Sequence, residues 1–298
     1  MNLLLKKATT TSKAISLETC DSFQSWQRRI ETSAEVYANQ WRFEQALAAL
    51  DSSDSFFGWC GLCGHETVFH IPSKIAGTPA NFREELVCEG CGMNARVRAG
   101  LQILSANGSF EADAVYITEQ ASPTFVWLQG RVKGLVGSEF VHDGSIKQNM
   151  QRYLNDLGGK GTIRFEDVTN LTFRDASLDA IASFDVLEHV PEYADAFREF
   201  ARVLKPSGIL VLTAPFISSQ QQTIVRARIG SDGAVEHLMQ PEYHGDPRSS
   251  EGILCFYHFG WDLLETARDA GFKEAYMTRP WLPGMGLMDH LWTLVAIR

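Results

Sequence analysis

Residues 162–215 read TIRFEDVTNLTFRDASLDAIASFDVLEHVPEYADAFREFARVLKPSGILVLTAP. Two apolar runs in this stretch, 178–184 and 208–214, have the length of buried strands. Between them, residues 192–203 repeat apolar side chains at helical spacing. Because antiparallel neighbours need only a tight turn, a helix between two strands is typical of strands that run parallel.

The same alternation continues on both sides of this stretch. Further candidate strands lie at 113–118, 134–139 and 162–166, with helices over about 123–132 and 145–156. Residues 217–257 are polar and irregular, long for a connection, and we expect a lid or a substrate segment there. A helix over 260–270 and strands over 272–278 and 291–298 follow. The pattern predicts an α/β fold whose helices cover both faces of a parallel sheet.

The quoted stretch closely resembles the later half of class I S-adenosylmethionine-dependent methyltransferases of the small-molecule type. Three motifs carry the resemblance, namely Phe165–Val168, Leu178–Val190 and Leu204–Leu210. The resemblance is highly specific over residues 162–215 and extends to about 101–298. It implies a Rossmann-like, seven-stranded methyltransferase sheet that binds S-adenosylmethionine.

Two acidic residues are candidates for binding the nucleoside part of that cofactor. Ligands of such a sheet bind outside the carboxyl ends of its strands. Glu139 ends the second strand, 20 residues after Glu119, where a carboxylate can accept bonds from both ribose hydroxyls. The resemblance places Asp167, next to Val168, against the adenine amino group. The alternatives are an ordinary loop acid at 139 and a turn cap at 167.

The end of the fourth strand carries a third group of candidates. The motif Leu178–Val190 contains Phe184 and Asp185 at the strand end, and we assign both to cofactor binding. For Asp185, shaping the loop is the favoured role over contact with the cofactor. His189 follows in the same loop, where the resemblance leaves a position near the transferred methyl group and a structural role both open.

The turn after the first strand lacks the glycine-rich loop expected in a nucleotide-binding fold. Residues 114–125 read AVYITEQASPTF, without a glycine. Ala121 and Ser122 are small, so the backbone can approach a ligand provided that no residue needs a positive φ. S-adenosylmethionine has no pyrophosphate, so we expect Glu119 to meet its ammonium and Gln120 to donate to its carboxylate. The altered loop also fits a non-catalytic scaffold.

Four of the six cysteines form two Cys-x-x-Cys pairs, each followed by glycine: Cys60, Cys63, Cys88 and Cys91. This spacing predicts a closed tetrahedral Cys₄ zinc site with a structural role. Two unconnected pairs of buried cysteines are the alternative. Cys20 and Cys255 are interpreted as isolated thiols.

Residues 236–261 gather side chains that transfer protons near neutral pH. We expect His244, His258 and Tyr243 to line the acceptor side of the site, with His244 the first candidate for a base and His189 a further one. A hydrogen-bonded loop anchor is the alternative. Methyl transfer is an in-line displacement, so alignment in a dry site matters more than a strong base.

Composition limits the classes of partner. The chain of 298 residues carries Lys+Arg 27 against Asp+Glu 36, a net charge of −9, which argues against a general nucleic-acid grip. No apolar run has the length of a membrane span. Paired cysteines suggest a reducing cytoplasm, and the leading leucines precede the lysines, the wrong order for a secretory signal. A homodimer is left open.

These observations predict three regions: a tail and helices over 1–54, a Cys₄ zinc module over 55–100 and a methyltransferase domain over 101–298, with the lid at about 217–257. The predicted function is methyl transfer from S-adenosylmethionine to oxygen or nitrogen of a small-molecule or glycan-related acceptor. The alternatives are an RNA-directed methyltransferase and a non-catalytic scaffold that binds partners through its zinc module.

Overall fold

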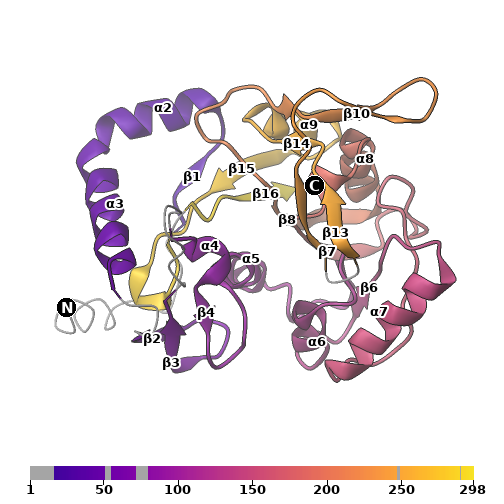
Figure 1. The fold of residues 1–298 in the computed structure, drawn as a ribbon, viewed down its shortest axis with the longest axis horizontal. Coiled ribbons are helices and arrows are strands. Elements are labelled where there is room, and N and C mark those ends of the chain that lie inside the picture. Colours follow the sequence, from indigo (N-terminus) through magenta and orange to yellow (C-terminus); the bar gives the residue numbers. More distant parts are fainter. Residues whose placement is uncertain (1–16, 51–54, 72–79, 247–248, 289) are drawn as a thin grey trace. The chain divides into compact units, whose positions relative to one another are not determined.

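The computed structural model describes residues 17–50, 55–71, 80–246, 249–288 and 290–298 (Figure 1). The chain divides into two compact units. Unit 1 comprises Met1–Asn107 and Met277–Thr293, and unit 2 comprises Gly108–Tyr276 and Leu294–Arg298. The three regions expected from the sequence remain a prediction, and unit 1 includes a segment from near the end of the chain.

The central sheet confirms the predicted α/β class. Its seven strands lie in the order β1 (Thr19–Cys20), β15 (Glu274–Thr278), β16 (Thr293–Ile297), β8 (Leu204–Thr213), β7 (Leu178–Phe184), β5 (Val115–Ile117) and β6 (Leu135–Gly137). The four strands from β8 to β6 are parallel. β16 runs antiparallel to β8, and β1 pairs antiparallel with Met277 and Thr278 at the end of β15.

The strand expected over 162–166 does not form, so this prediction was wrong. Only a single parallel bridge, Glu139 to Phe165, is present there. The backbone of this segment is held in other ways, because the N–H of Arg164 donates to the Gln120 side chain and its carbonyl accepts from the N–H of Glu139. A side chain therefore replaces part of the ladder that a strand would need.

The helices of unit 2 agree with the expected ones within a few residues: α6 (Pro123–Gln129), α7 (Gly144–Asp156), α8 (Tyr193–Val203) and α9 (Asp262–Asp269). α6 begins where the Ser122 hydroxyl accepts the N–H of Phe125 and where Pro123 occupies the first turn. α8 buries an apolar stripe that includes Phe197 and Phe200.

The segment expected to be irregular, 217–257, instead forms short antiparallel pairs, which is the second correction. They are β9 (Ile224–Val225) with β14 (Tyr257–His258), β10 (Ala227–Ile229) with β11 (Val235–His237), and β12 (Tyr243–Asp246) with β13 (Ser249–Leu254). The turn between β10 and β11 contains Gly233 at φ 80°, a left-handed position that glycine favours. This glycine-rich turn was the hairpin signal in the sequence.

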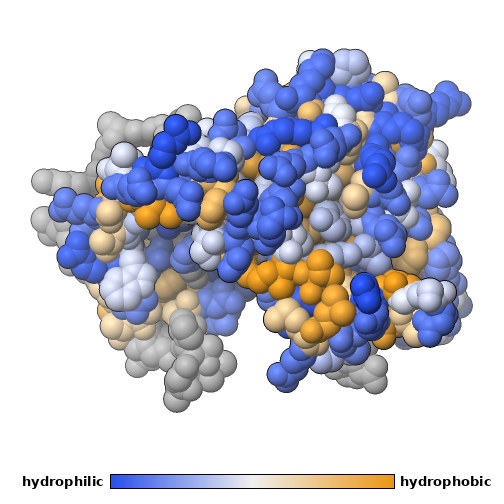
Figure 2. Space-filling model, turned by 90° about the horizontal axis from the view of Figure 1, so that it is seen from above, coloured by the Kyte–Doolittle hydropathy of each residue, from blue (hydrophilic) through white to orange (hydrophobic). Residues whose placement is uncertain are grey.

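Several apolar side chains of this segment are exposed: Val225, Ile229, Val235, Leu238 and Met239. On the face shown in Figure 2, hydrophilic residues cover most of the surface and hydrophobic residues gather in patches. Within the described ranges, no helix has both the length and the apolar character needed to cross a bilayer.

Unit 1 combines helices with a small sheet. Its elements are α2 (Phe23–Thr32), α3 (Ala34–Ala48), the antiparallel strands β2 (Ser55–Cys60), β3 (His65–His70) and β4 (Val87–Cys88), α4 (Phe82–Glu85), α5 (Ala95–Ala106) and the 3₁₀ turn η2 (Pro283–Met285). Phe56 and Phe69 pack with Leu287 and Leu291 in one apolar core. Residues from both ends of the chain thus share this core.

The side chain of Arg98, on α5, is fully buried in unit 1. Its guanidinium lies over the Phe69 ring, 4.6 Å from the centroid. It donates four bonds of 2.7–3.2 Å to the carbonyl oxygens of Met93, Leu86, Met285 and Gly286. Arg96 is bound to Glu84 through two nitrogens. Both arginines hold unit 1 together.

We predict that Arg98→Met destabilises unit 1 by about 3–5 kcal/mol, because four buried carbonyls lose their donor at once. Hydrogen exchange of the α5 amides in the full chain measures the free energy of opening. The matched control is Arg96→Met on the same helix, whose ion pair is partly exposed and should cost only about 1 kcal/mol. Equal losses in the two variants would contradict the assigned role of Arg98.

Candidate functional site

The predicted cofactor residues of unit 2 lie at one edge of the sheet. Parallel pairing aligns Ile117 with Gly137 on one side and with Ala182 on the other. The loops that leave β5, β6 and β7 therefore start side by side at their carboxyl ends, where ligands of such sheets bind. This arrangement brings together Glu119, Glu139 and Phe184, which are far apart in the sequence.

Glu139 occupies the end of β6 with its carboxylate buried, at 7% exposure. Its Oε1 accepts the N–H of Ala121 at 2.6 Å, so the acid and the loop after β5 hold each other in place. Gly137 is required nearby, since a Cβ there would lie 2.6 Å from the Phe125 ring.

The glycine-free loop reaches this edge without backbone strain. No residue from 118 to 123 has a positive φ, the condition that the sequence set for a loop of this composition. Glu119 joins the loop to the end of β7, because its Oε2 accepts from the Thr118 hydroxyl at 3.2 Å and from the N–H of Phe184 at 3.4 Å. Its carboxylate thus lies between two strand ends.

Gln120 is buried, and both ends of its amide are engaged. Nε2 donates to the carbonyl of Thr162 at 2.9 Å, and Oε1 accepts the N–H of Arg164 at 2.8 Å. It anchors the segment that carries Asp167. A bond from Gln120 to the cofactor remains a prediction and would have to use the second amide hydrogen.

Asp167 forms the turn that was its alternative role. Its Oδ1 accepts from the N–H of Thr169 at 2.9 Å and from the hydroxyl of the same residue at 2.6 Å. The adenine contact of Asp167 and its neighbour Val168 remains a prediction. It would use Oδ2 of Asp167, because the two bonds within the turn are made to Oδ1. Asp185 lies after β7 at φ 53° and accepts from the Thr213 hydroxyl at 2.8 Å. Its side chain shapes this loop, and its cofactor role stays a prediction.

Three aromatic rings beside Glu139 are site candidates that the sequence did not reveal. Phe140 is 60% exposed and lies 5.7 Å from the Phe165 ring, and His142 lies 4.5 Å from the same ring. An exposed aromatic face beside the acid that is predicted to bind the ribose can stack on a base. The signal in the sequence was a phenylalanine directly after the predicted acid at a strand end.

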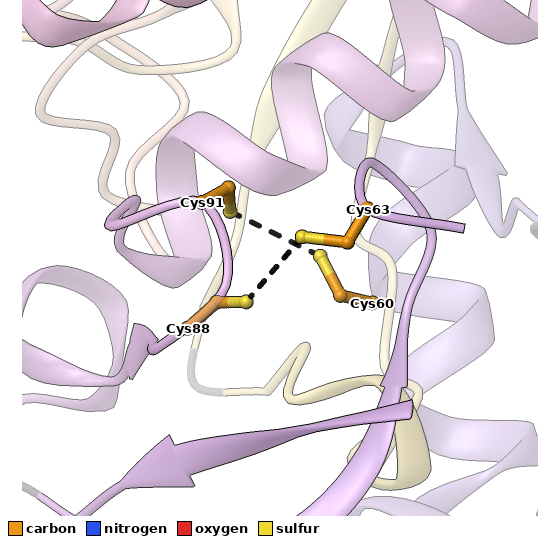
Figure 3. Close-up of side chains that lie close together, drawn as sticks. All are labelled: Cys60, Cys63, Cys88 and Cys91. Carbon is orange, nitrogen blue, oxygen red and sulfur yellow. Dashed lines mark hydrogen bonds between the residues drawn. The ribbon is translucent and has the colours of Figure 1, made fainter. Parts of the chain in front are cut away.

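The four paired cysteines of unit 1 converge (Figure 3). The Sγ atoms of Cys60 and Cys91 are 4.0 Å apart, those of Cys63 and Cys88 are 3.8 Å apart, and all four lie within 4.8 Å of one another. A regular tetrahedron with Zn–S bonds of about 2.3 Å has edges of about 3.8 Å. The quartet therefore has the dimensions of a closed tetrahedral metal site.

The backbone and the local charge fit the same interpretation. Gly64 and Gly92 both have φ 71°, and each donates its N–H to the carbonyl of the first cysteine of its pair. The hydrogen bond from Cys91 lowers the pKa of Cys60, whereas burial raises the pKa of Cys63. Four neighbouring thiols cannot all ionise unless a cation balances their charge. Burial lowers the pKa of Arg98. The negative charge of the nearby cysteine thiolates acts in the opposite direction and favours the charged guanidinium.

In unit 2, the predicted catalytic residues His189, His244 and His258 come together around two acids, Glu188 and Glu242. His244 Nε2 lies 3.1 Å from Glu242 Oε1, and His258 Nε2 lies 3.0 Å from the same oxygen. His189 lies against His244, with ring centroids 5.0 Å apart. Tyr243 is 53% exposed, so the structure brings the histidines together and leaves this tyrosine at the surface.

Cys255 also belongs to this cluster, so interpreting it as an isolated thiol was wrong. It is fully buried, and with Glu242 and His258 it places one ligand atom each within 4.8 Å. Burial opposes ionisation, but bonds from His244 and His258 outweigh it and lower the pKa of Cys255. The thiol of Cys255, and after it the carboxylate of Glu188, raise the pKa of His244 to about 11. Only the folded chain shows this pairing of residues 11 positions apart.

Comparison with known proteins shows that part of this chain is similar to methyltransferases. Residues 134–212 match the family model described as a methyltransferase domain. The 27-O-demethylrifamycin SV methyltransferase of Amycolatopsis mediterranei is 25% identical over 139 residues, 43% of this chain and 51% of that protein. Sterol 24-C-methyltransferase of Aspergillus fumigatus is 25% identical over 132 residues, 42% of this chain and 32% of that protein. The matches thus span about half of the first relative and about a third of the second.

A solved structure from Mesorhizobium loti, an S-adenosylmethionine-dependent methyltransferase, aligns with 65% of this chain and 96% of its own at 15% identity and a TM-score of 0.42. The matched family segment begins just before β6 and ends within β8, the parallel part of the sheet whose edge carries Glu139, Asp167 and Asp185. Residues 134–212 of this chain are therefore similar in sequence to a methyltransferase domain.

Proposed function

We propose that this chain transfers a methyl group from S-adenosylmethionine to oxygen or nitrogen of a small-molecule or glycan-related acceptor. The observation that carries the proposal is the buried Glu139 carboxylate, fixed at the end of β6 by the N–H of Ala121. A buried acid at the edge where three parallel strands end is suited to ribose hydroxyls. The cofactor supplies an electrophilic methyl group on a sulfonium.

The residues around this edge would divide the binding of the cofactor among them. Glu139 would accept the ribose hydroxyls, Glu119 would face the ammonium, and Asp167 with Val168 would meet the adenine. Phe140 would cover the base with its exposed ring. Gln120, Ala121, Phe184 and Asp185 would complete the wall by fixing the loops and presenting backbone groups.

The acceptor would bind on the side of the histidine cluster. His189 follows β7 at the same edge, and His244 and His258 reach it from the hairpin segment. These side chains would orient the acceptor, with His244 as the first candidate. The net charge of −9 and the small acceptors named in both relatives favour a small molecule over nucleic acid.

The cysteine quartet would bind zinc in a structural role. The edges of about 3.8 Å expected for a zinc tetrahedron agree with the measured Sγ separations of 3.8 and 4.0 Å. Four thiolates and Zn²⁺ together carry a net negative charge, which would balance the buried Arg98 beside them. Four ligands leave no open position, so this ion would stabilise unit 1 rather than take part in chemistry.

We predict that the zinc-loaded full chain binds S-adenosylhomocysteine. We expect Glu139→Gln to weaken this affinity by about tenfold to a hundredfold. Glutamine keeps the size of the side chain but loses charge-assisted bonds, each of which contributes about 1.5–3 kcal/mol. Isothermal titration calorimetry measures the affinity.

The control for this titration is Glu111→Gln, at an exposed acid outside the site, which should bind as the unchanged chain does. Methyl transfer is then followed by the release of S-adenosylhomocysteine in the presence of a panel of hydroxyl and amine acceptors. A zinc-loaded chain that binds neither form of the cofactor would overturn the proposed function.

For the zinc site, we predict that Cys63→Ser abolishes the thiolate-to-cobalt charge-transfer absorption of the Co²⁺-loaded chain and lowers the stability of unit 1. Metal binding to such sites supplies folding free energy, about 10–16 kcal/mol in zinc-finger peptides. Cys20→Ser, at a buried cysteine outside the quartet, is the matched control and should keep the absorption. Retention of the full charge-transfer band in Cys63→Ser would refute the Cys₄ assignment.

A further inference from the structure

Glu188, in the 3₁₀ turn η1 (Leu187–His189) after β7, carries a buried carboxylate without a hydrogen-bond donor. The side chain is 0% exposed, and both carboxylate oxygens lack a partner among the described residues. A buried charged group without partners costs several kcal/mol, so folded proteins seldom keep one without a compensating cation.

Two histidines face this carboxylate, and each is oriented by an oxygen on its far side. The Nδ1 atom of His189 lies 2.8 Å from the carbonyl of Leu254, and Nε2 of His244 lies 3.1 Å from Oε1 of Glu242. Because these oxygens are acceptors, each ring carries a hydrogen on that far nitrogen. The other nitrogens, His189 Nε2 and His244 Nδ1, are directed at the carboxylate. An oxygen partner behind each histidine is the usual support of a metal ligand.

The distances between these ring nitrogens and the Glu188 carboxylate show whether the groups are joined by a hydrogen bond or are spaced to share a metal ion. His189 Nε2 and His244 Nδ1 lie 3.7 Å and 3.5 Å from Glu188 Oε1. A charge-assisted hydrogen bond would bring such atoms to about 2.7–2.9 Å. Two ligands on one ion, with bonds of about 2.0–2.2 Å at tetrahedral angles, lie about 3.3–3.6 Å apart. The observed separations of 3.5 and 3.7 Å are closer to the spacing of ligands around an ion than to the length of a hydrogen bond.

We propose that Glu188, His189 and His244 form a second metal site, which takes a divalent transition-metal ion of the zinc class. Two imidazoles and one carboxylate are a ligand set that such ions favour. Glu242 orients His244 from behind, as carboxylates do for metal-bound histidines. The side chain of His244 is 29% exposed, which gives the ion a route of entry.

This site differs from the cysteine quartet in what it leaves open. Three protein ligands leave a coordination position for water or for a ligand oxygen, whereas four thiolates close their site. Resting on the proposed function, the open position takes an oxygen of the methyl acceptor, since Glu188 lies in the loop that follows β7 at the cofactor edge. The acceptor class is then a molecule that offers an oxygen to the metal.

The test uses the full chain, loaded with Zn²⁺ and freed of loosely bound ions by gel filtration. We expect mass spectrometry of the metal content to find a second equivalent of zinc beyond that of the cysteine quartet. Glu188→Gln and His244→Asn should each lose this second equivalent and retain the first. His237→Asn, an exposed histidine on β11 of the same segment, is the matched control and should retain both.

Cobalt substitution distinguishes the two sites by their ligands. In the Co²⁺-loaded chain the second site should add visible ligand-field bands without thiolate charge transfer, and Glu188→Gln should remove these bands alone. If either variant loses its fold by circular dichroism, the other decides. A wild-type chain with only the quartet's ion, or a folded Glu188→Gln that keeps the second, would overturn the proposal.

Calorimetry with S-adenosylhomocysteine on the same samples separates this inference from the proposed function. Wild-type chain that holds the second ion and does not bind the cofactor would support the metal site and refute the methyltransferase. Wild-type chain that binds the cofactor and holds only the quartet's ion would do the reverse.

Discussion

Parallel pairing of β5 with both β6 and β7 is the constraint on which the site depends. It aligns Ile117 with Gly137 and with Ala182, so three chain segments turn away from the sheet at one edge. Each loop then fixes another: Glu139 holds the N–H of Ala121, and Glu119 accepts from the N–H of Phe184. A carboxylate at this edge is thus a ligand-binding group and a structural one at the same time.

Local signals in the sequence predicted the features that depend on neighbours in the chain. The two Cys-x-x-Cys-Gly pairs gave the quartet because two short turns fix the sulfur positions, and apolar runs gave β5, β7 and β8 because these strands are buried. The strand expected at 162–166 failed because Gln120, more than 40 positions away, takes over part of its hydrogen bonding. Such a side-chain substitute for a ladder has no sequence pattern.

The histidine cluster shows the same limit. Composition identified His244 and His258, but their partners Glu188 and Glu242 resembled ordinary loop acids, and Cys255 resembled a lone thiol. The cluster exists because β12 and β13 pair and bring residue 244 opposite Ile253, beside Leu254, whose carbonyl faces His189. Pairing of hairpin strands over this distance depends on tertiary packing, which propensity does not encode.

The division of unit 1 along the chain has a consequence for its biosynthesis. Arg98 binds the carbonyls of Met285 and Gly286, 187 and 188 positions later. At about 5–20 residues per second, a ribosome needs roughly 10–40 s to extend the chain over that interval. The cysteine pairs precede Arg98 in the chain and are synthesised before this interval. Until synthesis nears completion, the Arg98 guanidinium of nascent unit 1 therefore lacks the carbonyl acceptors of Met285 and Gly286. Early coordination of metal by the cysteines would shelter this intermediate from aggregation and proteolysis during the wait.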